Sequence, residues 1–215
     1  MPPDRASAVT PEFTLLGLLY LEPGHGYELH ERLRRELGAV WTVRQNQVYN
    51  ILSRLEADGY VRAAIDLKGK SRQRRKLRLT PAGRRRFEAW LHKPTGLSVR
   101  ALRVDFLSRL YFARQMDPKC ALEIVDLQLS ATREGLEQME ARHEASPDQS
   151  PLEGMSMDLR LRQLHLAAEW LEGLSAQTRA LSRPSRARQP LNGGVRPPRT
   201  HGASRSPKGE HHSTA

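Results

Sequence analysis

The chain has 215 residues, with 35 Lys or Arg against 24 Asp or Glu, a formal net charge of +11 and a pI near 10.5. This length allows one or two small domains with a real core, and the positive charge favours nucleic acid or an anionic surface as partner. The single cysteine excludes an intrachain disulfide, and no apolar run approaches the roughly 20 residues that span a bilayer. The N-terminus has no apolar core of the signal-peptide kind. We therefore expect a cytoplasmic protein with no membrane partner.

Basic and acidic residues are unevenly distributed. Residues 12–93 carry a net charge of +8, residues 100–181 a net charge of −3, and residues 182–215 a net charge of +6. Within residues 62–86, eleven Lys or Arg stand against one acid. This pattern indicates a front half that meets a polyanion, a rear half that meets protein, and a basic tail.

Three short helices are predicted in the front half. Thr10 suits an N-cap and Pro11 the first helical position, so the first helix begins there. The second helix spans residues 26–37, and the third spans residues 45–58 with Gly59 as its stop. The residues expected to face the core are Phe13, Leu15, Leu16, Leu18, Leu19, Leu21, Tyr27, Leu29, Leu33, Leu37, Val48, Ile51, Leu52 and Leu55.

A two-stranded hairpin is predicted after the third helix. Apolar and polar residues alternate over residues 61–66 and again over residues 76–79, which is the period of half-buried strands. We expect Gly69 in the turn between them. Thr80 and Pro81 then open another helix with the same threonine cap and proline.

The rear half is predicted to be wholly helical. One helix covers residues 99–115, and Asp117 with Pro118 starts the next. A loop at residues 146–151 separates this from a last helix. Two apolar stripes at heptad spacing follow these helices: Leu122, Val125, Leu129, Thr132, Leu136, Met139 and His143, then Met157, Leu161, Leu164, Ala168 and Leu171.

The two stripes allow two interpretations. They either pack only on each other, as an antiparallel hairpin, or also pack on a second copy of the chain. Because a seam this long buries little on a two-helix arm without a partner, the sequence favours a homodimer. The predicted dimer contacts are Leu122, Val125, Leu129, Leu136, Met139, Leu161, Leu164 and Leu171.

The expected fold class is mainly α with a small β-hairpin wing. A winged helix-turn-helix domain over residues 10–93 is followed by an α-helical dimerisation domain over residues 94–181. Residues 1–9 form a flexible N-terminus. Residues 182–215 form a disordered basic tail that either adds non-specific DNA affinity or only improves solubility.

The third helix and the hairpin are the predicted DNA-binding elements. Amides can pair with adenine and arginine with guanine from a helix in the major groove, so Gln47 and Asn50 are the first choices for base contact. The alternative is that this polar face of the third helix is only solvated and contacts no DNA. The same alternative applies to Arg84, Arg85 and Arg86. The full predicted set is Gln45, Asn46, Gln47, Tyr49, Asn50, Ser53 and Arg54 on the helix, with Lys68, Lys70, Arg72, Arg74 and Arg75 on the wing.

Three segments, LLGLLYLEPGHGYEL, QVYNILSRLEADGYV and LRLTPAG, resemble the PadR-family transcriptional regulators, and LSRLYFARQMDP resembles the start of that family's helical domain. The resemblance implies a homodimeric repressor that binds double-stranded DNA. In some relatives, the repressor responds to aromatic ligands. Relatives commonly differ near Arg44, Asn46, Asn50 and Lys76, so neither operator sequence nor wing tyrosine contacts carry over. Trp41 and Trp90 are the candidate effector contacts, with ordinary core aromatics as the alternative.

Enzymes are the class that the sequence disfavours. The histidines lack the spacing of metal ligands, the serines lack a nucleophile motif, and no glycine loop resembles a phosphate cradle, so we expect neither catalysis nor a metal or cofactor. A protein-interaction adaptor that keeps the fold without specific DNA binding is the remaining alternative. The dense basic wing argues against it.

Overall fold

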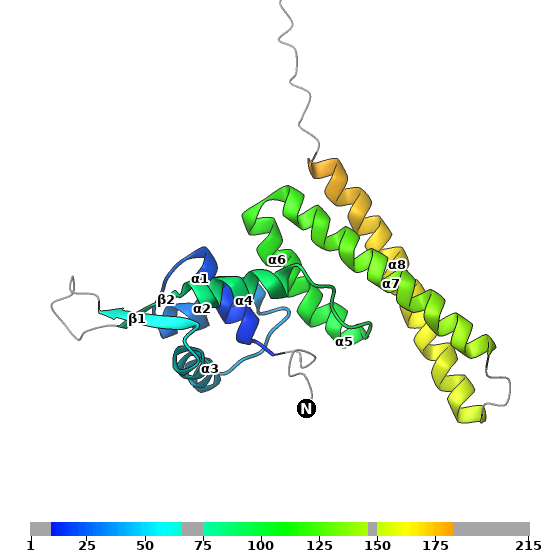
Figure 1. The fold of residues 1–215 in the computed structure, drawn as a ribbon, viewed down its shortest axis with the longest axis horizontal. Coiled ribbons are helices and arrows are strands. Elements are labelled where there is room, and N and C mark those ends of the chain that lie inside the picture. The colour runs from blue at the N-terminus through cyan, green and yellow to red at the C-terminus, as the bar shows by residue number, and fades with distance from the viewer. Residues whose placement is uncertain (1–9, 66–74, 146–149, 183–215) are drawn as a thin grey trace, which may run out of the picture. The chain divides into compact units, whose positions relative to one another are not determined.

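Helices joined by short turns, with one two-stranded antiparallel sheet, make up this computed structural model (Figure 1). It describes residues 10–65, 75–145 and 150–182. The elements are α1 (Glu12–Leu21), α2 (Gly26–Leu37), α3 (Gln45–Ala57), β1 (Val61–Ile65), β2 (Arg75–Leu79), α4 (Pro81–Leu91), α5 (Val99–Ala101), a π-helical turn η2 (Leu102–Phe106), α6 (Leu107–Met116), α7 (Pro118–Glu144) and α8 (Pro151–Ser182).

The predicted helix starts hold at two of three positions. Thr80 Oγ1 accepts a hydrogen bond from Gly83 N at 3.1 Å, and the Asp117 side chain accepts one from Lys119 N at 2.9 Å. The expected cap at Thr10 is wrong: Pro11 occupies the N-cap position of α1 and no side chain caps it. Helix α1 starts one residue later than expected, because the Pro11 carbonyl accepts its first helical hydrogen bond.

The hairpin pairs β1 with β2 in antiparallel register, from Val61 opposite Leu79 to Ile65 opposite Arg75. A third segment joins it: Gly24 and Leu77 exchange both backbone hydrogen bonds, at 2.9 and 3.1 Å. The turn after α1 is therefore fixed to the base of the wing. The predicted turn at Gly69 lies outside the described residues.

The leucines of α1, α2 and α3 form the core of the front half, with Val61, Leu77 and Phe87 from the hairpin and α4. The prediction that Tyr27 faces the core is wrong, because its side chain is 57% exposed. Tyr27 precedes buried Leu29 by two residues, and side chains two apart on a helix point to different sides. Gly59, as expected, stops α3 with a φ of +76°, a conformation that glycine adopts without strain.

The rear half consists of a helical stretch from α5 to α6 and a long hairpin of α7 and α8, which lie side by side in Figure 1. Ion pairs join Arg133 to Glu172 and Asp126 to Arg179, so higher numbers on α7 meet lower numbers on α8 and the helices are antiparallel. The two predicted stripes supply the buried side chains between them, including Val125, Leu129, Thr132, Leu164, Ala168 and Leu171.

No helix within the described ranges is long and apolar enough to cross a membrane. The predicted disordered tail lies outside the described residues except for its first residue, Ser182, which ends α8. Most of the predicted loop before α8 also lies outside the described residues.

Candidate nucleic-acid interface

Helix α3 presents a polar face to solvent. Its opposite side is held in the core by Val48, Leu52 and Leu55, which are at most 3% exposed. All seven α3 residues that the sequence predicts for DNA contact are exposed: Gln45, Asn46, Gln47, Tyr49, Asn50, Ser53 and Arg54. The packing of one face thus determines which residues a ligand can reach.

Two amides on this face are already engaged at the start of the helix. Gln47 Oε1 accepts a hydrogen bond from the Arg44 backbone N–H at 3.0 Å, and Asn46 Oδ1 accepts one from Gln47 N at 2.8 Å. Gln47 therefore caps α3 and uses one acceptor position of its Oε1 to do so. Among the described residues, Asn50 makes no such side-chain bond.

Tyr49 is positioned by the start of α2. A methyl group added at Gly26 would lie 2.6 Å from Tyr49 Cε1, closer than real contacts allow, so the absence of a side chain at Gly26 leaves room for the ring. His25 precedes this glycine, and its Nδ1 lies 3.1 Å from the Arg75 carbonyl oxygen on the wing. The start of α2, at His25 and Gly26, therefore contacts both α3 and β2.

Ion pairs flank α3 on both sides. Arg54 Nη2 lies 2.8 Å from Glu12 Oε2 of α1, and Glu56 Oε1 lies 2.7 Å from Arg75 Nη2 of β2. These pairs join α3 to its two neighbours, α1 and β2. Arg75 is the predicted wing cation that the structure describes; the expected DNA contacts Lys68, Lys70, Arg72 and Arg74 lie outside the described residues.

Two of the three arginines near the start of α4, Arg84 and Arg86, have partners within the chain. Arg86 Nη2 donates to Glu12 Oε1 at 2.8 Å, and its Nη1 donates to Tyr60 Oη at 3.0 Å. The Arg84 guanidinium lies 4.3 Å from the centre of the Tyr20 ring. These contacts offset the unfavourable position of cations at a helix N-terminus.

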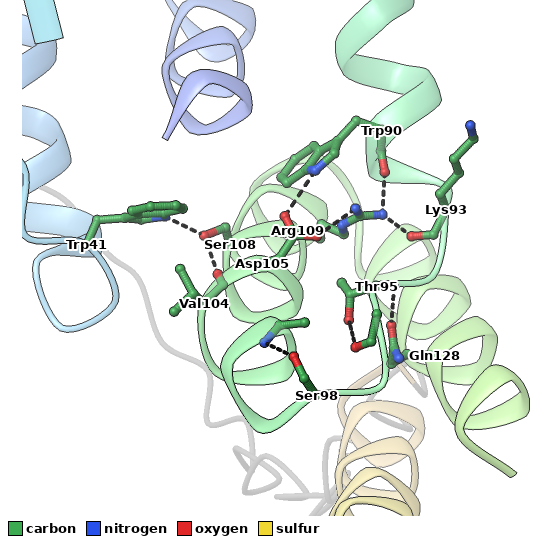
Figure 2. Close-up of polar contacts among 12 residues, drawn as sticks. Trp41, Trp90, Lys93, Thr95, Ser98, Val104, Asp105, Ser108, Arg109 and Gln128 are labelled. Carbon is green, nitrogen blue, oxygen red and sulfur yellow. Dashed lines mark hydrogen bonds and ion pairs between the residues drawn. The ribbon is translucent and has the colours of Figure 1, made fainter. Parts of the chain in front are cut away.

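A polar network joins the front half to α6 (Figure 2). The side chain of Arg109 is 6% exposed; it donates to the Trp90 carbonyl at 2.5 Å and to the Lys93 carbonyl, and pairs with Asp105 at 2.8 Å. Burial lowers the pKa of its guanidinium, while Asp105 opposes that shift. Arg109 thus binds one carbonyl in the last turn of α4 and one just after the helix, and the Trp90 carbonyl also accepts from Lys93 N at 3.2 Å.

Both candidate effector tryptophans belong to this junction. Trp90 is 7% exposed, stacks on Phe13 with ring centres 5.2 Å apart, and donates to Asp105 at 3.1 Å. Trp41 donates to Ser108 Oγ at 2.8 Å. Each indole N–H therefore has a partner in the protein, as the core-aromatic alternative expects.

A second contact between the halves lies beside this network. Tyr111 Oη donates to Glu36 Oε2. Burial, and to a smaller extent this hydrogen bond, raises the pKa of Tyr111 to about 12. Gly17 of α1 meets Phe112, which is fully buried. The front half is packed against α6 through apolar and polar groups together.

An apolar strip on α8 was missed by the sequence interpretation. It consists of residues that point away from α7 and are 45–77% exposed: Leu152, Met155, Leu159, Leu166 and Trp170. Part of the strip borders a groove of about 290 Å³ between α8 and the residues Val99, Leu102 and Leu107. Val125, Leu129, Leu164 and Leu171, the buried members of the predicted dimer contacts, are instead covered within one chain.

Within the described ranges, no group of three or more His, Cys, Asp or Glu side chains is arranged to hold a metal ion. The described residues offer an exposed polar face on α3, the basic strand β2 and an apolar strip on α8. Together with the hairpin, this arrangement defines a winged helix-turn-helix protein of the transcription-regulator class.

Residues 15–89 match the model of the transcriptional regulator PadR-like family. The chain is 24% identical over 135 residues to the negative transcriptional regulator PadR of Bacillus subtilis (strain 168), covering 62% of this chain and 72% of that protein. Among solved structures, it is similar to Bacillus subtilis PadR in complex with operator DNA (23% identity, 78% of this chain and 98% of that one, TM-score 0.37) and to the Vibrio cholerae virulence activator AphA (17%, 80% and 99%, 0.36).

Proposed function

We propose that this chain binds double-stranded DNA as a homodimer and represses transcription from a pseudo-palindromic operator. The observation that carries the proposal is the polar face of α3, which is exposed along its length and flanked by the basic strand β2. A helix held in this way by its apolar side can enter the major groove without unfolding.

The proposal divides the DNA contacts by chemistry. Asn50 is the first choice for base readout, because its amide is exposed and unengaged, whereas the Gln47 Oε1 already accepts the hydrogen bond that caps the helix. Tyr49 and Ser53 would contact the DNA sugar-phosphate backbone near the base that Asn50 reads. The wing, with Lys68, Lys70, Arg72, Arg74 and Arg75, supplies sequence-blind attraction to phosphates. The proposed DNA-binding domain covers residues 10–93.

The homodimer is proposed to form through the helical arm, residues 94–181. The apolar strip on α8 is the surface that one chain leaves uncovered, so it takes over the role that the sequence assigned to the buried stripe residues. Leu122, Leu136, Met139 and Leu161 are half-buried and lie where a partner could still reach them. A two-fold dimer places two α3 helices on one face of DNA and requires two matching half-sites.

Repression and an effector complete the proposal. Repression is supported by the likeness to a negative regulator. A small aromatic or hydrophobic effector, contacted near Trp41 and Trp90, rests on the family resemblance of the sequence. Because both indoles are anchored at the junction between the halves, a ligand that displaced either one would act on that junction.

DNA binding is tested by titrating labelled operator and random duplexes, with the operator first mapped by footprinting upstream of the chain's own gene. We expect Asn50→Ala to weaken operator binding by about 1–3 kcal/mol and to leave the salt dependence unchanged. Replacing Lys70, Arg72 and Arg75 together by alanine should weaken both duplexes alike and reduce the slope of log affinity against log salt by about 0.9 for each lost phosphate contact.

Two results would count against this function. If the triple wing variant binds as tightly as the wild type at every salt concentration, the wing assignment is wrong. If the wild-type chain shows no duplex binding even at low salt, the adaptor alternative takes its place.

A further inference from the structure

One carboxylate lies beside the proposed DNA-binding face and binds two arginines, one of them on that face. Glu12 is the first residue of α1, and its side chain is 13% exposed. Its Oε2 lies 2.8 Å from Arg54 Nη2 of α3, and its Oε1 lies 2.8 Å from Arg86 Nη2 of α4. The Glu12 carboxylate is thus an anionic ligand for one cation of the proposed DNA-binding face and for one cation of α4.

The two arginines differ in what else holds them. Arg86 also donates to Tyr60 Oη at 3.0 Å, and its guanidinium lies 4.5 Å from the centre of the Tyr60 ring and 5.4 Å from that of Phe13. Arg54 is 55% exposed, and its described polar contact is Glu12 alone. Loss of the carboxylate would therefore release Arg54 and leave Arg86 in place.

A released Arg54 would lie where DNA is proposed to bind. It follows Asn50 by four residues, so the two side chains occupy the same side of α3. An unpaired guanidinium there can neutralise a phosphate of any DNA sequence, which adds affinity without adding discrimination. While Glu12 holds Arg54, that phosphate must compete with a carboxylate already at hydrogen-bonding distance.

We propose that Glu12 is a positioning residue that withholds Arg54 from sequence-blind phosphate contact and so increases the discrimination between operator and random DNA. This inference rests on the DNA-binding function proposed above. The carboxylate acts through Arg54, and the operator is read by other residues of α3.

The test compares Glu12→Gln with Glu22→Gln in the full-length protein. Glu22 lies at the opposite end of α1, its side chain is 72% exposed, and it approaches Arg32 only at 4.0 Å, so the control removes the same charge without releasing Arg54. On random duplex, we expect the salt slope of Glu12→Gln to steepen by about 0.9, which makes the loss of affinity between 50 and 200 mM salt about threefold larger. Glu22→Gln should leave the slope near that of the wild type.

Arg54→Ala, made in both backgrounds, assigns the effect. It should change the random-DNA slope little in the wild type and remove the added slope in Glu12→Gln. Equal slopes for the two glutamine variants, or an equal effect of Arg54→Ala in both backgrounds, would overturn the proposal. A purely structural role for Glu12 would instead lower Tm and weaken both duplexes without a change of slope.

Elution from immobilised heparin separates this inference from the proposed function, because it needs no operator. Glu12→Gln should elute at higher NaCl than Glu22→Gln. If that difference holds while the wild type fails to bind duplex DNA, the proposed function is wrong and the withholding of Arg54 stands. If the two variants elute together, the proposal fails.

Discussion

At the scale of single residues, sequence patterns indicated which side chains are exposed but not what engages them. The polar face of α3 follows from the spacing of Val48, Leu52 and Leu55, and the structure confirms that this face is exposed. The cap made by Gln47 and the ion pair of Arg54 could not be predicted. Each depends on where another segment lies, and a helical period carries no information about its neighbours.

Gly17 gives a prediction at this scale. In a helix interior, Gly→Ala usually stabilises by about 0.5–1 kcal/mol. Here, however, the added Cβ would lie 2.5 Å from Phe112 Cζ, and Phe112 is fully buried and has no room to move. We therefore expect Gly17→Ala to lower the free energy of unfolding by about 1–2 kcal/mol, measured by urea denaturation.

The matched control is Gly154→Ala on α8, where no atom lies within 4 Å of the added Cβ. It should be neutral or stabilise by up to about 1 kcal/mol. If both variants stabilise the protein, the close approach of α1 and α6 is not a constraint on the fold.

At the scale of elements, the periods of 3.6 and 2.0 were sufficient to predict the helices and the hairpin, including the bounds of α2. Two features escaped prediction because they have no period. The Gly24–Leu77 bridge is a single residue pair, and the π-helical turn η2 is one widened turn within an otherwise continuous helix. The cap at Thr10 was wrong because threonine before proline suits two neighbouring helix starts equally well.

Alanine substitutions at Thr80 and Thr10 measure the difference between a threonine that caps its helix and one that does not. Thr80 Oγ1 accepts from Gly83 N and donates to the Gly59 carbonyl at 2.7 Å, so Thr80→Ala should lower the free energy of unfolding by about 1–2 kcal/mol. Thr10→Ala removes no cap and should change it by less than about 0.5 kcal/mol. Thermal or urea unfolding of both variants checks this pair, and equal losses would contradict the assigned caps.

At the scale of the whole molecule, the surface left uncovered by one chain suggests how two chains meet. Helix α8 has two apolar stripes, and heptad spacing alone did not tell which faces α7. The structure assigns Leu164 and Leu171 to the intrachain seam, while Leu159 and Leu166 are exposed. Only the packed hairpin distinguishes the two, since both stripes satisfy the same spacing.

Charges on the exposed strip should prevent dimer formation. We expect Leu159→Glu with Leu166→Glu to shift the molar mass in solution from twice the chain mass to 24.4 kDa, with helical circular dichroism retained, because the strip contributes little to the fold of one chain. Light scattering coupled to size exclusion measures this. Gln138→Glu with Ala141→Glu adds the same charge to exposed positions of α7 and should leave a dimer. A dimer in both cases would exclude the strip as the interface.

The junction at Arg109 also bears on how regulators of this kind can be recombined. Phe112 covers Phe87 with ring centres 5.4 Å apart, and Arg109 binds the carbonyls of Trp90 and Lys93. Residues 10–93 consequently lack part of their own core and part of their own helix cap. A hybrid that transplants this segment onto a foreign arm must bring a buried aromatic and a buried arginine with it, so the natural unit of exchange extends through α6.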